Sequence, residues 1–155
     1  MVGIEPLSHL TNLKVLDIVN QDFGFNIEPL KNLSGLIRLM LFFSILPEVD
    51  HLAGLVNLEE LEIHGGDLID LKGIAGLKKL RLLKLESYEL TDLIPLSQLS
   101  ALEHLESIEC ESLKDLFPLR QLSKLKYLLI ADCDVLGDDE TLTQLANCGV
   151  IISRH

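Results

Sequence analysis

Leucines recur along the chain with a constant period. Leu55, Leu77 and Leu99 lie 22 residues apart, and the leucines three and six residues after each of them repeat this spacing. The series extends back to Leu10 and, at a spacing of 23, forward to Leu122. A fixed period of this length is typical of a solenoid, in which each repeat packs only against its neighbours. The pattern therefore predicts six consecutive repeats.

The repeats follow one another without a boundary, so we expect one domain over residues 1–155. No glycine- or serine-rich hinge, charge block or low-complexity tract separates them. The repeats cover approximately residues 4–26, 27–48, 49–70, 71–92, 93–115 and 116–137, and residues 138–155 form a terminal cap.

Each repeat has two halves with different periods. In the first half, for example residues 93–99, apolar residues occur at every third position, which suits a short 3₁₀ or α-helical segment. Prolines recur where a helix tolerates a missing N–H group, at Pro6, Pro29, Pro95 and Pro118. Residues suited to capping precede them at Asn26, Asp70, Asp92 and Asp115. The second half alternates, as in Leu83-Lys84-Leu85, which predicts a short strand with its leucines inward.

One strand and one helical segment per repeat predict an α/β solenoid, with a parallel sheet on one side and helical segments on the other. The end of the chain differs from the repeats. Residues 138–140 are acidic and precede a predicted helix over residues 141–147, which Gly149 terminates. Residues 150–152 are then a seventh and final strand.

The strand segments carry the residues of a known signature. Residues 58–63 and 125–133 match the leucine-rich-repeat pattern LxxLxLxxN/C, and the step over residues 115–119, Asp-Leu-Phe-Pro-Leu, resembles the bacterial, internalin-like class of that family. The resemblance covers residues 4–136. It implies a right-handed horseshoe, with the parallel sheet on its concave side, 3₁₀ or helical segments on its convex side, and protein recognition on the concave sheet. The family shares a scaffold and not an activity.

The sequence departs from this repeat signature in three respects. The Asn/Cys position of the signature holds different residues in different repeats: Gln21, Ser44, Gly66, Tyr88, Cys110 and Cys133. Ser107 stands where a strand leucine belongs, which we interpret as a local shift of the fifth strand. No capping module precedes the first repeat, so we expect an open N-terminal edge that exposes apolar surface and could mediate self-association.

Alternate residues of a strand face opposite sides, which identifies the side chains on the concave sheet. They form three columns. The central column is Asp17, Met40, Glu62, Lys84, Glu106 and Leu129. The flanking columns are Val15, Arg38, Glu60, Leu82, His104 and Tyr127, and Val19, Phe42, His64, Glu86, Ile108 and Ala131.

Two patches are predicted on this face. Met40, Phe42 and Phe43 form an apolar cluster, with the alternative that one of the two phenylalanines turns inward. An acidic field covers repeats three to five and consists of Glu59, Glu60, Glu62, Glu86, Glu103, Glu106 and Glu109. Basic residues are expected mainly on the convex side, at Lys31, Lys72, Lys78, Lys79, Arg120 and Lys124.

These patches supply the candidate partner-binding residues. They are Met40, Phe42, Phe43, Glu60, Glu62, His64, Lys84, Glu86, His104, Glu106, Tyr127 and Leu129. An acidic field steers a basic partner and raises its rate of association, and an apolar cluster supplies a buried anchor. The alternative is that the carboxylates only keep an exposed sheet in solution.

The net charge argues against two classes of partner. The chain has 13 Lys and Arg against 24 Asp and Glu, a formal net charge of −11. Such a surface repels nucleic acid and anionic membranes. The first residues contain no basic region followed by an apolar run, and three cysteines favour a reducing compartment, so we expect a cytoplasmic protein. Cys110 and Cys133 occupy equivalent positions, and we expect reduced thiols there rather than a disulfide.

Patterns of catalysis and cofactor binding are absent from the sequence. It contains no glycine-rich phosphate loop, nucleophile elbow or metal-ligand spacing, so we expect no enzyme activity, cofactor or metal. The leading hypothesis is a non-catalytic module that binds a basic protein on its concave sheet. Two alternatives stay open: an immunity-type protein that neutralises a specific toxin or effector, and a structural spacer or self-associating segment of a larger repeat protein.

Overall fold

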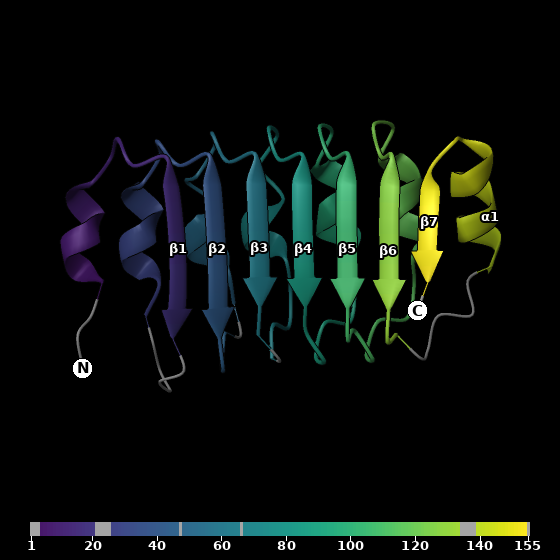
Figure 1. Ribbon diagram of the computed structural model, residues 1–155, viewed down its shortest axis with the longest axis horizontal. Coiled ribbons are helices and arrows are strands. Elements are labelled where there is room, and N and C mark those ends of the chain that lie inside the picture. Colours follow the sequence, from purple (N-terminus) through teal and green to yellow (C-terminus); the bar gives the residue numbers. More distant parts are fainter. Residues whose placement is uncertain (1–3, 21–25, 47, 66, 134–138, 155) are drawn as a thin grey trace.

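Seven parallel strands form one sheet in the computed structural model, which describes residues 4–20, 26–46, 48–65, 67–133 and 139–154 (Figure 1). Each strand pairs with the next one along the chain. The strands are β1 (Val15–Asn20), β2 (Arg38–Phe43), β3 (Glu60–His64), β4 (Leu82–Glu86), β5 (His104–Ile108), β6 (Tyr127–Ala131) and β7 (Ile151–Arg154). With neighbouring strands about 4.8 Å apart, the sheet is open, uncurled and roughly 29 Å wide.

Short helices form a second layer behind the sheet (Figure 1). The 3₁₀ helices are η1 (Glu5–His9), η2 (Glu28–Asn32), η3 (Asp50–Leu52), η4 (Lys72–Ile74), η5 (Ile94–Gln98) and η6 (Phe117–Gln121). The α-helix α1 (Asp139–Asn147) lies at the β7 end of this layer. The predicted leucine-rich-repeat solenoid, with a parallel sheet on one side and short helices on the other, is confirmed.

Polar side chains hold the starts of the 3₁₀ helices. The backbone N–H of Lys72 donates a hydrogen bond to Asp70 Oδ1 at 3.0 Å. The equivalent bond, from the backbone N–H group two residues later in the chain, is accepted by the other predicted capping residues, Asn26, Asp92 and Asp115. The capping interaction is therefore confirmed, but it comes from one residue before the N-cap position, which is occupied in η4 by the apolar Leu71.

Leucines from both halves of every repeat fill the space between the two layers. Leu58, Leu80 and Leu102 before the strands are completely buried, and so are Leu61 and Leu83 within them. Burying one such side chain contributes about 1.5–3 kcal/mol relative to leaving it in water. Because every repeat presents leucines at the same places, a single continuous core runs along the solenoid.

Strand β5 keeps its register, so the predicted local shift at Ser107 is wrong. Ser107 lies opposite Leu85 on one side and Ile130 on the other, in the series of inward-facing residues. Its side chain is buried, and its hydroxyl donates a hydrogen bond to Cys110 Sγ at 3.0 Å. Because this bond satisfies the hydroxyl, the core accepts serine without a displacement of the strand.

The position at the downstream end of β2, β3 and β4 turns toward the core. It holds Phe43, Gly65 and Ser87, which are all buried. Phe43 is only 3% exposed, so its predicted place in the outer apolar cluster is wrong, and it is the phenylalanine that turns inward. Glycine is required at position 65, where a Cβ atom would lie 2.9 Å from the carbonyl oxygen of Phe43.

The same position takes a different backbone conformation after β5 and β6. Glu109 and Asp132 have φ angles of 56° and 53°, in the left-handed region. This turn directs the following Cys110 into the core, where it is completely buried, and Cys133 is partly buried. The signature position therefore faces inward here but not in the preceding repeat, where Tyr88 is exposed. Gln21 and Gly66 lie outside the described residues.

The predicted helix and final strand are both present at the C-terminal end of the solenoid. Helix α1 ends before Gly149, whose φ of 87° suits the residue that follows a helix. Strand β7 then pairs with β6 and is the seventh strand. The predicted acidic residue Asp138 lies outside the described residues.

Candidate functional site

The strands present three columns of side chains on the face that points away from the helices, which we call the sheet face. Asp17, Met40, Glu62, Lys84, Glu106 and Leu129 lie opposite one another in successive strands, as do both predicted flanking columns. The predicted columns are therefore confirmed. They could be predicted because a two-residue period in parallel register fixes which side chains are neighbours.

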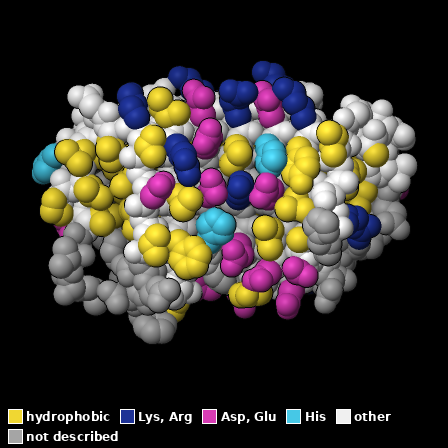
Figure 2. Space-filling view, viewed as in Figure 1, with side chains coloured by type: hydrophobic (Ala, Val, Ile, Leu, Met, Phe, Trp, Pro, Cys, Tyr) yellow, Lys and Arg dark blue, Asp and Glu magenta, His cyan; other side chains and the backbone are white. Residues whose placement is uncertain are grey.

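Apolar side chains predominate at the β1 and β2 end of the sheet face, around the exposed Asp17 of the central column (Figure 2). Val15, Val19 and Phe42 are 52%, 69% and 40% exposed. Met40 lies half-buried between them in the central column. We call these four residues the apolar patch. Because large apolar side chains lose stabilisation when they are left in water, a contiguous group of them indicates a contact surface.

A row of alternately basic and acidic side chains crosses the middle of the sheet face. Arg38 Nη2 lies 3.8 Å from Glu62 Oε1, and Lys84 Nζ lies 3.8 Å from Glu62 Oε2. The same ammonium is 3.7 Å from Glu106 Oε2, and His104 Nε2 is 2.7 Å from Glu106 Oε1. We call these five residues the charged row. The side chains of Glu62 and Glu106 are only 14% and 18% exposed, so both carboxylates are largely enclosed by their partners.

The charged row changes the predicted acidic field. Its two central carboxylates already contact cations of the same sheet, so they attract a partner less than their charge alone suggests. Glu60 and Glu86 are more exposed than these two carboxylates, at 49% and 34%. Arg38 was not among the predicted site residues, although its place in the column next to Glu60 and beside Met40 could have identified it.

Two histidines connect the charged row to aromatic rings. His64 stacks on Phe42 with ring centroids 5.8 Å apart, and its Nδ1 lies 3.0 Å from Glu86 Oε2. His104 stacks on Tyr127 at 4.4 Å, with the ring planes inclined by 21°. The predicted residues of β2 to β6 therefore form one continuous surface, apart from the buried Phe43.

The rim at the upstream ends of the strands is rich in basic residues (Figure 2). Lys78, Lys79 and Lys124 line a shallow hollow there with Glu59 and Glu103. Their predicted place on the convex side is therefore wrong. These lysines follow the helical half of each repeat, in the turn that leads back to the sheet.

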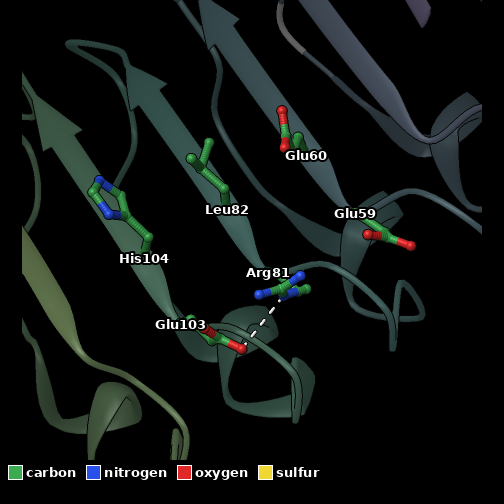
Figure 3. A pocket seen from close by; sticks show the side chains of 6 residues that line it. All are labelled: Glu59, Glu60, Arg81, Leu82, Glu103 and His104. Carbon is green, nitrogen blue, oxygen red and sulfur yellow. Dashed lines mark hydrogen bonds and ion pairs between the residues drawn. The ribbon is translucent and has the colours of Figure 1, made fainter.

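Glu103 is the centre of the ion pairs on this rim. Lys126 Nζ lies 2.7 Å from Glu103 Oε2, and Arg81 Nε lies 3.3 Å from Oε1. The hydrogen bond from Lys126, followed by that from Arg81, holds the pKa of Glu103 below its ordinary value of 4.5. Figure 3 shows Arg81 and Glu103 in a neighbouring hollow of about 200 Å³, which also adjoins His104 on the sheet face.

The rim at the downstream ends of the strands is acidic (Figure 2). Tyr88 forms a hydrogen bond with Glu109, and this bond, followed by the negative charges of Glu109, Glu86 and Glu111, raises the pKa of Tyr88 above 10.0. The sheet face is therefore bordered by opposite charges at its two rims.

The three cysteines lie in the interior and at the C-terminal end of the protein. All three cysteines are free. Hydrogen bonds from Cys133 and then from Ser107 lower the pKa of Cys110 to about 7, against the effect of burial, and the same interaction with Cys110 raises the pKa of Cys133.

Within the described residues, His, Cys, Asp and Glu form no group of three that could hold a metal ion. The helices described are all too short to cross a membrane.

Solved structures with the same architecture come from bacteria and from an animal. Internalin C2 of Listeria monocytogenes has a TM-score of 0.80 and 24% identity over 99% of this chain and 66% of its own length. A leucine-rich-repeat protein of Leptospira interrogans has a TM-score of 0.77 and 22% identity over 99% of this chain and 40% of its own. A chain in the complex of Toll with Spätzle from Drosophila has a TM-score of 0.68 and 17% identity, over 82% of this chain and 18% of its own.

These likenesses establish the internalin-like leucine-rich-repeat fold. The chain spans about two thirds of the first of these structures and less than half of the other two. No family model matches the sequence, and no curated protein matches it either.

Proposed function

We propose that this internalin-like leucine-rich-repeat chain is a non-catalytic module that binds a protein partner on its sheet face. The observation that carries the proposal is the apolar patch. Val19 and Phe42 are register partners on adjacent strands and keep 69% and 40% of their surface exposed. Exposed apolar side chains that lie together contribute little to the stability of the fold, whereas they supply the anchor of a protein interface.

The charged row supports the proposal by making the surface rigid. Its five side chains are already held by one another, so they lose little rotamer entropy when a partner arrives. Their alternating charges also require the opposite alternation from a partner, which favours one position of the partner over others. The row therefore acts on specificity and the apolar patch on affinity.

We further propose that the partner presents basic side chains. Glu60 and Glu86 remain accessible beside the charged row, and Glu109 and Glu111 extend the negative charge to the downstream rim. Carboxylates arranged in this way attract a cationic surface and raise its association rate, and the effect weakens as salt is added.

The first experiment is affinity capture from an extract of the source cells with two matched variants. Val19→Ser with Phe42→Ser removes the apolar patch, whereas Val56→Ser with Phe117→Ser makes the same changes at exposed positions off the sheet face. We expect a protein captured by the wild type to be lost only with the first variant. Equal capture by the wild type and both variants would refute a binding site at the apolar patch.

A second pair of variants tests the charge of the partner. Glu60→Lys with Glu86→Lys reverses the accessible carboxylates of the sheet face, and Glu5→Lys with Glu48→Lys makes the same change of net charge elsewhere. We expect the association rate with the captured protein to fall several-fold for the first variant only. An equal decrease for both would assign the effect to net charge, and no decrease would contradict a basic partner.

A second candidate function is self-association through β1. Among the described residues no strand pairs with the outer edge of β1, and Leu10, Val15 and Val19 are exposed beside it. Sedimentation at increasing protein concentration tests this function. A dimer that is lost with Ile4→Ser and Leu7→Ser would favour it, whereas a monomer at all concentrations would exclude it.

A further inference from the structure

Basic side chains gather on one rim of an otherwise acidic protein. Five of the 13 Lys and Arg residues lie at the upstream ends of β4 and β6 or in the turns before them, which we call the upstream rim. They are Lys78, Lys79, Arg81, Lys124 and Lys126. Among the described residues that line the hollow on this rim, only Glu59 and Glu103 oppose them. The local charge is therefore positive, although the whole chain has a net charge of −11.

The repeat positions explain how these side chains form a hollow. Lys79, Ala101 and Lys124 occupy equivalent places in three successive repeats. The small Ala101 in the middle repeat leaves space between the two lysines, and the resulting hollow has a volume of about 350 Å³. Because two strand spacings separate them, the backbones of Lys79 and Lys124 are roughly 10 Å apart.

The charges around the hollow are only partly neutralised. The carboxylate of Glu103 forms ion pairs with Lys126 Nζ at 2.7 Å and with Arg81 Nε at 3.3 Å. Lys79 Nζ donates to a neutral acceptor, Asn57 Oδ1, at 2.7 Å. Lys124 makes no hydrogen bond or ion pair with any residue in the described part of the chain.

We propose that the upstream rim is a second binding site, which takes an acidic peptide segment of a protein. The two outer lysines are separate point charges, and this geometry suits several carboxylates along a chain. In an extended polyproline-II segment, residues i and i+3 lie on the same side and about 9 Å apart, which matches the spacing of Lys79 and Lys124. The site is independent of the sheet-face proposal, because it uses other residues and requires a partner segment of opposite charge.

The backbone around the hollow distinguishes this ligand from a single phosphate group. Lys78 Nζ is held by the carbonyl oxygens of Ala75 and Gln98, at 3.1 and 2.8 Å, at the C-terminal ends of η4 and η5. Carbonyl groups at a helix C-terminus carry partial negative charge and disfavour a concentrated anion. Carboxylates spread along a peptide can reach the outer lysines without approaching these carbonyls.

The test is fluorescence anisotropy with a labelled glutamate peptide of about eight residues, long enough to span the hollow. A glutamine peptide of the same length and a phosphoserine peptide of the same net charge serve as comparisons. At about 0.1 M salt the Debye length is roughly 10 Å, so distant carboxylates of the chain are screened. We expect the glutamate peptide to bind in preference to both others.

Two matched variants locate the binding site. Lys79→Gln with Lys124→Gln should raise the Kd about tenfold, because two ion pairs with the peptide are lost. Lys31→Gln with Lys72→Gln makes the same change of net charge on the helical side and should change the Kd less than about twofold. Val19→Ser with Phe42→Ser should leave the Kd unchanged.

Four results would overturn the proposal: no binding of the glutamate peptide, preference for the phosphoserine peptide, equal weakening by both lysine variants, or loss of binding in the apolar-patch variant. Equal weakening by both lysine variants would assign peptide binding to the net charge of the chain, and loss of binding in the apolar-patch variant would assign it to the sheet face. Because the probe is a synthetic peptide, a failed capture on the sheet face does not affect this test.

Discussion

Replacing Lys84 by methionine removes the cation that connects the two halves of the charged row. The ammonium lies 3.8 Å from Glu62 and 3.7 Å from Glu106, and at this separation one contact has a Coulomb energy of about 1–4 kcal/mol for effective dielectric constants between 80 and 20. Desolvation and side-chain ordering offset most of this energy. We therefore expect Lys84→Met to lower the free energy of unfolding by about 1–2 kcal/mol.

Urea denaturation followed by circular dichroism measures this loss. With a slope of about 2 kcal/mol per M, the midpoint should fall by roughly 0.5–1 M. The triple variant Lys84→Met, Glu62→Gln, Glu106→Gln should regain at least half of the loss, because it also removes the carboxylates that need a cation. Lys126→Met, at the exposed upstream rim, is the control and should have the smaller effect. A Lys84 variant as stable as the wild type, or no less stable than this control, would refute the stabilising role of the row.

Three further predictions concern other parts of the chain. Phe43→Ser should lower the free energy of unfolding by about 3–5 kcal/mol, because it removes a buried ring, whereas Phe42→Ser should leave it almost unchanged; similar urea midpoints for the two would contradict the inward turn of Phe43. Because the pKa of Glu103 is lower in the folded state, its stabilising contribution is present above pH 4.5 and is lost as the pH falls through the folded value. Stability measured from pH 6 to pH 2.5 should therefore decrease less in Glu103→Gln, and parallel curves would contradict this. In the native protein the exposed Cys148 should react first with a disulfide reagent, and Cys110 should react only on unfolding; rapid labelling of Cys110, identified by mass spectrometry, would show that the core opens locally.

Most of the fold and the columns of the sheet face could be predicted from the sequence. The leucine period fixes what is buried in each repeat, and a parallel sheet with one residue of each strand per row then fixes the neighbours. This reasoning placed Glu62, Lys84 and Glu106 in one column. Their contact distances depend on side-chain rotamers, which periodicity does not determine.

The errors fall where repeats with the same spacing differ in backbone conformation. Phe43 and Glu109 occupy the same repeat position, yet one ends a strand and points into the core, while the other has a positive φ angle. No periodic signal distinguishes them. The predicted convex position of Lys78, Lys79 and Lys124 is wrong for a related reason, because the sequence does not show where the helical half ends and the turn toward the sheet begins.

Because charge alternates along the central column, it matters whether an odd or an even number of repeats is gained or lost. Glu62, Lys84 and Glu106 belong to three consecutive repeats, so a deletion of the repeat over residues 71–92 would place two carboxylates side by side. Duplication of the pair of repeats that carries Glu62 and Lys84 would preserve the alternation. A solenoid that grows by whole repeats is therefore expected to do so, in this region, in steps of two.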